Sequence, residues 1–251
     1  PLYFQYMAFL FHEIYPDFYW RESAKLCDAI NQLLPTFNKP LKKAEQVESY
    51  QESDLNKLAF WMATGAGKTL LMHANILQTN HYLKKYNKQK SIEQSILLTP
   101  NARLSEQHYE ELRSSGINAS LYSKNLSTPS SDIFGQAAIL ILDIHKLKDK
   151  DGDTTVAVGN FEGRNLVFID EGHRGASGED WLDKREQLCE YGFSYEYSAT
   201  FEQAIAGAST TKNKETKISP QQRLTQLYAK CILLDYSYRY FYNDGFGKDS
   251  H

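Results

Sequence analysis

The segment "KLAFWMATGAGKTLLM", residues 57–72, decides the fold of this chain. Its first part, "KLAFWMA", is apolar and short, which predicts a buried strand. Its last part continues as "KTLLMHANIL" from Lys68 and predicts a helix, because apolar residues recur on one helical face. The turn between them contains Gly65 and Gly67. A glycine-containing turn between the end of a strand and the start of a helix is the setting of a phosphate-binding loop.

This turn also has the residue types that bind phosphate. Backbone N–H groups at a helix start lack intrahelical partners and carry the positive end of the helix dipole. Gly65 and Gly67 permit the backbone angles that turn successive N–H groups inward. Lys68 would neutralise β- and γ-phosphate charge, and the Thr69 hydroxyl would bind Mg²⁺. We therefore expect ATP and Mg²⁺ as cofactors, with the nucleotide held by Ala63, Thr64, Gly65, Ala66, Gly67, Lys68 and Thr69.

A second apolar strand, "NLVFID", ends in two acids, Asp170 and Glu171. Paired acids at the end of a buried strand are costly unless a cation or a substrate compensates them. In a doubly wound sheet, this end of the strand faces the ligand crevice. We expect Asp170 to hold Mg²⁺ through water, and Glu171 to position and deprotonate the attacking water. Acids also cap helices, so a capped loop over "DEGHRGASGED" is the alternative.

From about residue 57 onward, short apolar runs alternate with helical stretches. The runs include "SILLTP", "INASLYS", "AAILILD" and "FSYEYSA", and the helical stretches include "ARLSEQHYEELRSS" and "EDWLDKREQLCEY". This alternation predicts an α/β sandwich with a mainly parallel sheet. Residues 1–35 predict two helices, and Pro35 and Pro40 bracket a break after them. Two polar, turn-rich stretches, 148–164 and 208–222, are predicted to be surface loops.

Composition excludes several classes of protein. The 251 residues carry a net charge of −3, without the overall basic character of a small nucleic-acid-binding domain. Composition therefore gives no support to nucleic-acid binding but does not exclude it, because a local groove can be basic on an acidic protein. The three cysteines have no C-x-x-C spacing, which argues against a zinc site or a disulfide framework and favours a reducing, cytoplasmic setting. The apolar opening, "PLYFQYMAFLF", is interrupted by His12 and Glu13, so it is shorter than the ~18 residues of a membrane span. We expect no membrane association.

Four short motifs carry a resemblance to a known group of proteins. "ATGAGKT" (63–69), "LLTPN" (97–101), "DEGH" (170–173) and "SAT" (198–200) resemble motifs I, Ia, II and III of superfamily 2 helicases and translocases, in that order. Longer stretches such as "TPNARLSEQH" and "FIDEGHRG" are most similar to helicases of the type III restriction enzyme kind. The resemblance covers roughly residues 55–205, and Gly172 in motif II excludes the strict DEAD-box RNA helicases.

The resemblance implies a fold and further roles. The fold is a RecA-like P-loop NTPase three-layer sandwich with a mainly parallel sheet and an N-terminal helical extension. His173, Ser198 and Thr200 would couple the nucleotide state to movement along the nucleic acid, although His173 also fits an ordinary loop histidine. Thr99, Pro100 and Asn101 match the element that contacts the nucleic-acid backbone, and such contacts position the protein without reading sequence.

We expect three parts along the chain. Residues 1–40 would be the helical extension, residues 41–235 the RecA-like ATP-binding lobe, and residues 236–251 an exit segment toward a second lobe. Because the sequence begins with Pro1, we interpret it as part of a longer polypeptide that contains this second lobe. For adenine recognition, Gln46 and Gln51 are weak candidates. The sequence shows no paired acid–lysine arrangement of a nuclease, since "ETK" (215–217) fits a solvated charge run, so any endonuclease activity would lie outside this segment.

The function predicted from these features is the motor lobe of an ATP-dependent DNA helicase or translocase from a type III-like restriction or phage-defence enzyme. Its partners would be nucleic acid, with duplex DNA favoured, the second lobe, and a methyltransferase or other defence subunit. Alone, the lobe should bind ATP but hydrolyse it poorly, because an arginine supplied from outside contributes ~10³–10⁵ in rate in comparable systems. The alternatives are an RNA helicase or remodeller of another superfamily 2 branch and an ATP-gated binding module without turnover.

Two further stretches have ordinary structural interpretations. "KKYNKQK" (84–90) predicts a solvated helix end rather than a basic patch. "DYSYRYFY" (235–242) alternates tyrosine with other residues, which predicts a half-buried strand rather than a platform for nucleic-acid bases.

Overall fold

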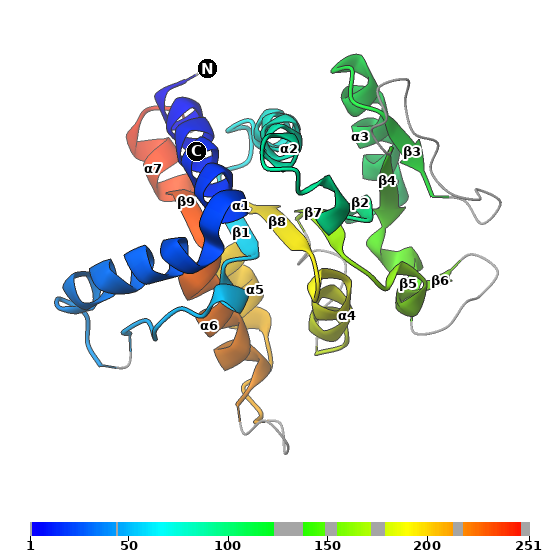
Figure 1. Ribbon diagram of the computed structural model, residues 1–251. Helices are drawn as coiled ribbons and strands as arrows, with labels where there is room; N and C mark the ends of the chain where they lie inside the picture. The colour runs from blue at the N-terminus through cyan, green and yellow to red at the C-terminus, as the bar shows by residue number, and fades with distance from the viewer. Residues whose placement is uncertain are drawn as a thin grey trace.

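A seven-stranded sheet organises the chain, and all of its described strand pairs are parallel (Figure 1). The computed structural model describes residues 2–43, 45–122, 138–148, 155–171, 179–212 and 218–246, without the side chains of residues 179–182. The strands lie in the order β3 (Ala119–Leu121), β4 (Ile139–Asp143), β2 (Gln94–Thr99), β7 (Asn165–Asp170), β8 (Phe193–Ser198), β1 (Lys57–Met62) and β9 (Ile232–Tyr236).

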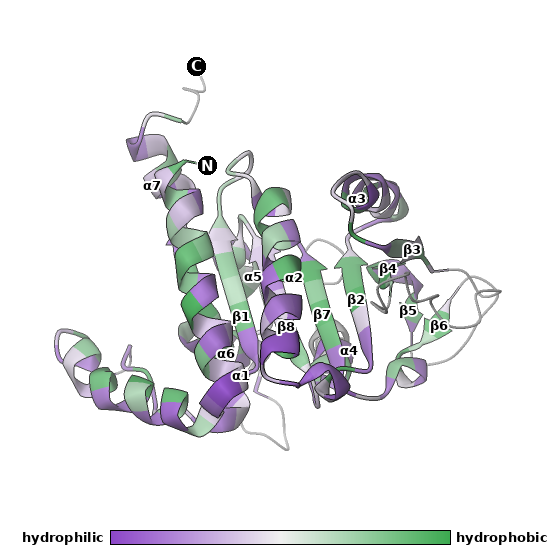
Figure 2. Ribbon diagram, turned by 45° about the horizontal axis from the view of Figure 1, so that its top comes forward, coloured by the Kyte–Doolittle hydropathy of each residue, from purple (hydrophilic) through white to green (hydrophobic). Residues whose placement is uncertain are grey.

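Helices cover both faces of this sheet and give three layers. One face is covered by α1 (Tyr3–Asn38), α2 (Lys68–Lys85) and α3 (Ala102–Ser114), and the other by α4 (Glu179–Cys189), α5 (Phe201–Gly207) and α6 (Pro220–Cys231). In Figure 2 the strands β1, β7 and β2 are mostly hydrophobic, whereas α3 is largely hydrophilic. Strands buried on both faces need such continuous apolar runs. The predicted α/β sandwich is confirmed.

The shorter elements lie in the connections. They are η1 (Glu52–Asp54), η2 (Gln89–Ser91), η3 (Ile144–Lys146), η4 (Val158–Phe161), α7 (Tyr238–Asn243) and a separate two-stranded sheet of β5 (Leu147–Lys148) and β6 (Val156–Ala157). None of the helices in the described ranges has both the length and the apolar character needed to cross a membrane.

Helix α1 contains the two helices predicted for the N-terminal region, joined at a kink. Its backbone leaves the helical region at Glu22 (φ −156°, ψ 77°). The predicted break at Pro35 is wrong, because the helix continues to Asn38. The last turn is held by the Asn38 side chain, which bonds both the N–H and the carbonyl group of Val47, at 2.9 and 2.8 Å. These two bonds stabilise a turn that the proline alone would weaken.

Two other local predictions are also wrong. Residues 148–164 are not only surface loop, because β6 and η4 bury Val156, Val158 and Phe161 in the core beneath β4 and β7. The tyrosine-rich stretch does not continue as a strand, because β9 ends at Tyr236 and α7 follows. Tyr236 is buried against Phe4 of α1, and the hydrogen bond from Tyr236 to Asp244 (2.6 Å) joins the end of β9 to the turn after α7.

Strand β8 connects the two layers of helices through buried polar groups. On one face, the Tyr197 hydroxyl accepts a hydrogen bond of 2.9 Å from Asn75 of α2. On the other face, Glu196 and Arg185 of α4 form a buried ion pair of 2.5 Å, and the Tyr228 hydroxyl donates to Glu196 at 2.9 Å. Buried charges of this kind are tolerated only with partners. The strand is therefore fixed between specific residues of α2, α4 and α6.

A buried histidine connects α1 to the same strand. His12 is fully buried and donates from Nδ1 to Gln78 Oε1 at 2.8 Å, because the amide oxygen can only accept. Its Nε2 then accepts from the Tyr195 hydroxyl at 3.0 Å. Both ring nitrogens are satisfied by the neutral imidazole, and burial lowers the pKa of His12 from 6.5 to about 4.

His12 should make the stability of the fold depend on pH. Between pH 6.5 and about 4, the unfolded chain binds a proton at this residue that the folded chain does not. The free energy of unfolding should therefore fall as the pH falls through this window, by about 3 kcal/mol from His12. Urea unfolding across the window should show this loss in the wild type and its absence in His12→Gln. His81→Gln, an exposed change on α2, should follow the wild-type curve. Equal pH slopes for wild type and His12→Gln would contradict the assignment.

Candidate nucleotide-binding site

Three loops meet at the carboxyl edge of the sheet. The loop at residues 63–67 follows β1, the two acids end β7, and the residues 198–200 follow β8, which lies between β7 and β1. The strands are in register at this edge, since Trp61 pairs with Ser198 and Asp170 pairs with Tyr197. In a parallel sheet, this edge is where ligands bind. The fold therefore brings together the three sequence motifs of residues 63–69, 170–171 and 198–200.

The loop before α2 has the backbone of an anion-binding turn. Gly65 and Gly67 have positive φ angles of 84° and 92°, and Gly67 is the N-cap residue of α2. Thr64 and Gly65 are exposed, whereas Ala63 and Ala66 are buried and anchor the loop. Free N–H groups at the start of an 18-residue helix favour an anion at this position. Thr69 is partly exposed in the first turn of α2.

Lys68 and Glu171 form an ion pair between the first two motifs. Lys68 Nζ lies 3.0 Å from Glu171 Oε1, and the two side chains are only 13% and 11% exposed. The same ammonium group donates to the Met62 carbonyl at 3.4 Å. Because the pair is largely removed from water, each charge needs the other or an equivalent ligand charge.

Glu171 has a backbone conformation that is rare for a residue with a side chain. Its φ angle is 47°, and its N–H donates to the Tyr197 carbonyl at 2.9 Å. Such a conformation costs on the order of 1–3 kcal/mol and persists where the surroundings impose it. Here the carboxylate accepts from Ser198 Oγ at 3.0 Å and from the Ala199 N–H at 3.3 Å. The third motif therefore holds the second acid directly.

Asp170 has a different partner. His108 Nε2 of α3 lies 3.0 Å from Asp170 Oδ2, and the Asp170 side chain is 14% exposed. Within the described ranges, no group of three or more His, Cys, Asp or Glu side chains is arranged to hold a metal ion. Mg²⁺ needs only one or two carboxylates when phosphate and water complete its octahedron. The Thr69 hydroxyl and the Asp170 carboxylate are oxygen ligands of the right type for such a site.

The structure also places most of the residues predicted for coupling and for nucleic-acid contact. Ser198 is buried, and the Thr200 N–H donates to Ser198 Oγ at 3.1 Å as α5 begins. His173 lies outside the described residues. At the end of β2, Thr99 and Pro100 are buried, and the exposed Asn101 caps α3 by accepting from the Leu104 N–H at 3.0 Å. A nucleic acid at this element would therefore meet Asn101 and the first turn of α3.

The sequence prediction missed Gln5. Its Nε2 donates to the Ala66 carbonyl in the loop at 3.0 Å, and its Oε1 accepts from the Leu2 N–H at 2.9 Å. The first turn of α1 is thus fastened to the phosphate-binding loop. The signal available in the sequence was a glutamine in the first turn of a predicted helix, but nothing local indicated that this turn contacts residues 61 positions away.

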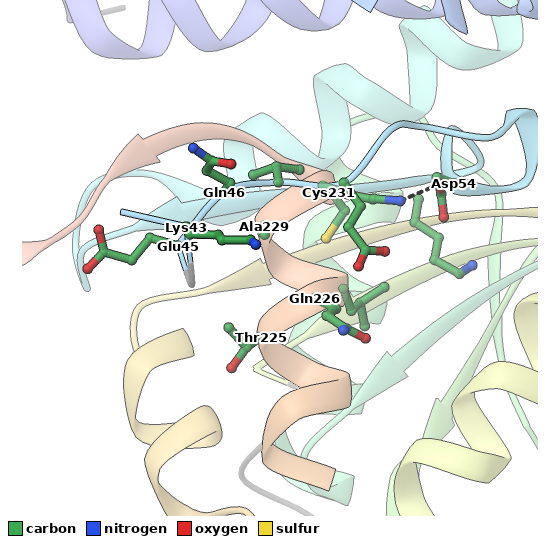
Figure 3. A pocket seen from close by; sticks show the side chains of 13 residues that line it. Lys43, Glu45, Gln46, Asp54, Thr225, Gln226, Ala229 and Cys231 are labelled. Carbon is green, nitrogen blue, oxygen red and sulfur yellow. Dashed lines mark hydrogen bonds and ion pairs between the residues drawn. The ribbon is translucent and has the colours of Figure 1, made fainter. Parts of the chain in front are cut away.

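The two glutamines proposed for adenine lie elsewhere. Gln46 lines a cavity of about 420 Å³ together with Lys57 at the start of β1 and with residues of α6 (Figure 3). Gln51 precedes η1, before the same end of β1. Both precede the amino end of β1, whereas the loop at residues 63–67 follows its carboxyl end. A groove of about 680 Å³ does border that loop, lined by Thr64, Thr200 and residues of α7.

Comparisons with known proteins identify a family for the chain. The model of a family described as "Type III restriction enzyme, res subunit" matches residues 27–203, more than half of the chain. Among solved structures, the chain is similar to the "Sulfolobus solfataricus SWI2/SNF2 ATPase core domain", with 14% sequence identity and a TM-score of 0.42. That similarity covers 75% of this chain and 42% of that chain. No curated protein matches the sequence.

The glycines of the loop give a prediction that does not depend on a ligand. Gly65→Ala should cost about 1–2 kcal/mol, because the residue has positive φ although nothing lies within 4 Å of the added Cβ. Gly67→Ala should cost about 1 kcal/mol more, because its Cβ would lie 2.6 Å from Gln5 Nε2 and displace the bond to Ala66. Urea unfolding measures both. In a Gln5→Ala background the two glycine variants should cost the same, and a persisting difference would contradict the contact.

Proposed function

Because this chain belongs to the family of type III restriction enzyme res subunits, we propose that it is the ATP-binding motor lobe of an ATP-dependent DNA helicase or translocase. It would belong to a type III-like restriction or phage-defence enzyme and hydrolyse ATP with Mg²⁺ when a second RecA-like lobe completes the site. The observation that carries the proposal is the 3.0 Å contact between Lys68 and Glu171, because it joins the phosphate-binding loop to the acid pair.

In this proposal, Lys68 exchanges partners when nucleotide binds. The ammonium group that pairs with Glu171 in this structure is the one that would neutralise the β- and γ-phosphates. Loop N–H groups around Gly65 and Gly67 would hold phosphate oxygens, and Thr69 with Asp170 would hold Mg²⁺. The metal ion would supply charge neutralisation at the phosphates. Glu171, released from Lys68, would then be free to orient and deprotonate a water molecule.

The link from Glu171 to the third motif supports the coupling role. Ser198 Oγ donates to Glu171 and accepts from the Thr200 N–H, so a change at the carboxylate reaches the start of α5 through two hydrogen bonds. His173 would add to this coupling. At the end of β2, Asn101 and the first turn of α3 would contact the backbone of duplex DNA. The partner proteins would be a second lobe and a methyltransferase or other defence subunit.

The first test separates binding from catalysis. Lys68→Ala should lower ATP affinity by about 10- to 100-fold, the effect of losing hydrogen bonds to a charged group worth about 1.5–3 kcal/mol. Glu171→Gln should keep the affinity but lower hydrolysis about 10²- to 10⁴-fold, because general-base catalysis is lost. Calorimetry gives the affinities, and phosphate release by the full-length protein with duplex DNA gives the rates.

The controls are exposed residues of the same charge that lie away from the site. Lys84→Ala, in the last turn of α2, and Glu162→Gln, before the amino end of β7, should leave both quantities unchanged. If Lys68→Ala and Glu171→Gln lost affinity equally, the separate roles would be refuted. If the wild-type full-length protein bound ATP without any hydrolysis stimulated by nucleic acid, the ATP-gated binding module would replace the motor.

The second test concerns coupling. Thr200→Ala should leave hydrolysis without nucleic acid unchanged but reduce its stimulation by duplex DNA, because it keeps the backbone bond to Ser198 and removes only the side chain at the N-cap of α5, to which the resemblance assigns the coupling. Thr225→Ala, an exposed change on α6, is the control. Full stimulation in Thr200→Ala would remove the coupling role. The same assay with single-stranded RNA distinguishes the DNA motor from an RNA helicase, since stimulation by RNA alone would favour the second.

A further inference from the structure

Helix α3 places a buried imidazole directly behind the proposed metal ligand. His108 is 3% exposed, and its Nε2 lies 3.0 Å from Asp170 Oδ2. A carboxylate has only acceptor atoms, so His108 donates from Nε2. The other ring nitrogen, Nδ1, is buried and has no hydrogen-bond partner in the described part of the chain. The imidazole therefore makes one directed contact, and that contact is with Asp170.

The backbone that carries His108 is firmly fixed. Asn101 caps the first turn of α3, and Thr99 Oγ1 lies 2.6 Å from Ser105 Oγ, which joins the end of β2 to the same turn. One turn beyond His108, Leu112 is fully buried in the main core. The ring consequently cannot follow the carboxylate as a flexible surface side chain would, and its N–H group restricts where Asp170 Oδ2 can lie.

We propose that His108 is a positioning residue, which holds the Asp170 carboxylate in the orientation that binds Mg²⁺ together with the nucleotide. The inference rests on the proposed function, because it assigns Asp170 to the metal. Hydrogen bonds to a ligating carboxylate orient it, and their loss typically lowers metal affinity by about 10- to 100-fold. The resemblance assigns Thr99, Pro100 and Asn101, which precede α3, to nucleic acid, and His108 gives the helix itself a task at the metal site.

The alternative is that His108 only fills space between α3 and the sheet. His73 provides a matched control, because it is a second buried histidine and it contacts the C-cap residue of α3. It comes from α2, and its Nδ1 lies 2.9 Å from Ser115 Oγ rather than near an acid of the site. A general loss of packing should affect both positions alike.

The test measures ATP binding as a function of Mg²⁺ concentration, with EDTA as the metal-free reference. His108→Leu keeps the apolar volume and removes the N–H donor, whereas His108→Gln keeps an N–H donor. His108→Leu should raise the Mg²⁺ concentration at half-maximal enhancement of ATP binding by about 10-fold or more, with ATP affinity in EDTA unchanged. His108→Gln should recover most of this loss, and His73→Leu should leave the Mg²⁺ midpoint at the wild-type value.

Four results would overturn the assignment. An unchanged midpoint in His108→Leu would show that the contact does not position Asp170. Equal shifts in His108→Leu, His108→Gln and His73→Leu would show a packing effect, as would a loss of ATP affinity in EDTA. If the wild type bound ATP identically with Mg²⁺ and with EDTA, the metal role of Asp170 would fail, and the proposed function with it. Circular dichroism melting of each variant confirms that folded proteins are compared.

Discussion

The ion pair between Lys68 and Glu171 is the interaction on which the site depends. Lys68 begins α2 after the loop that follows β1, and Glu171 comes directly after β7, with β8 between these two strands. The pair is largely withdrawn from water. A buried charge of either sign would be strongly unfavourable alone. The parallel sheet places the segments after β1 and β7 at the same edge, where Lys68 Nζ lies 3.0 Å from Glu171 Oε1. The order of the strands therefore determines which charged side chains meet at the site.

Buried polar contacts elsewhere in the structure fix the position of β8, the strand between the two motifs. His12 and Asn75 fasten α1 and α2 to hydroxyl groups on β8, while the Arg185–Glu196 pair fastens α4 to its other face. The strand between the two motifs is thus held from both sides. Gln5 fixes the loop at residues 63–67 in a similar way, because its hydrogen bond joins the Ala66 carbonyl to the first turn of α1.

The sequence predicted those parts of the site whose residues are adjacent in the chain. Residues 63–69, 170–171 and 198–200 each carry their own strand end or helix start, so their grouping followed once a parallel sheet was inferred, and the family match confirms the resemblance. Gln5 and His108 could not be found in this way. Their partners lie 61 and 62 residues away, and a glutamine or histidine in a helical pattern does not indicate which surface it will meet. The prediction of a strand over residues 235–242 was wrong for a related reason, since alternation of tyrosines does not reveal that β9 ends at Tyr236.

The two acids show how neighbouring residues acquire different tasks. Asp170 ends β7 in strand conformation and points to a histidine of α3, whereas Glu171 has positive φ and turns toward β8 and the loop after β1. Asp170 accepts one hydrogen bond from the His108 N–H group, and its negative charge stays available to a cation. Glu171 is surrounded by an ammonium group, a hydroxyl group and an amide, all donors that a bound triphosphate would partly take over. The turn at Glu171 separates the two environments, and this separation is what a division into a metal ligand and a base requires.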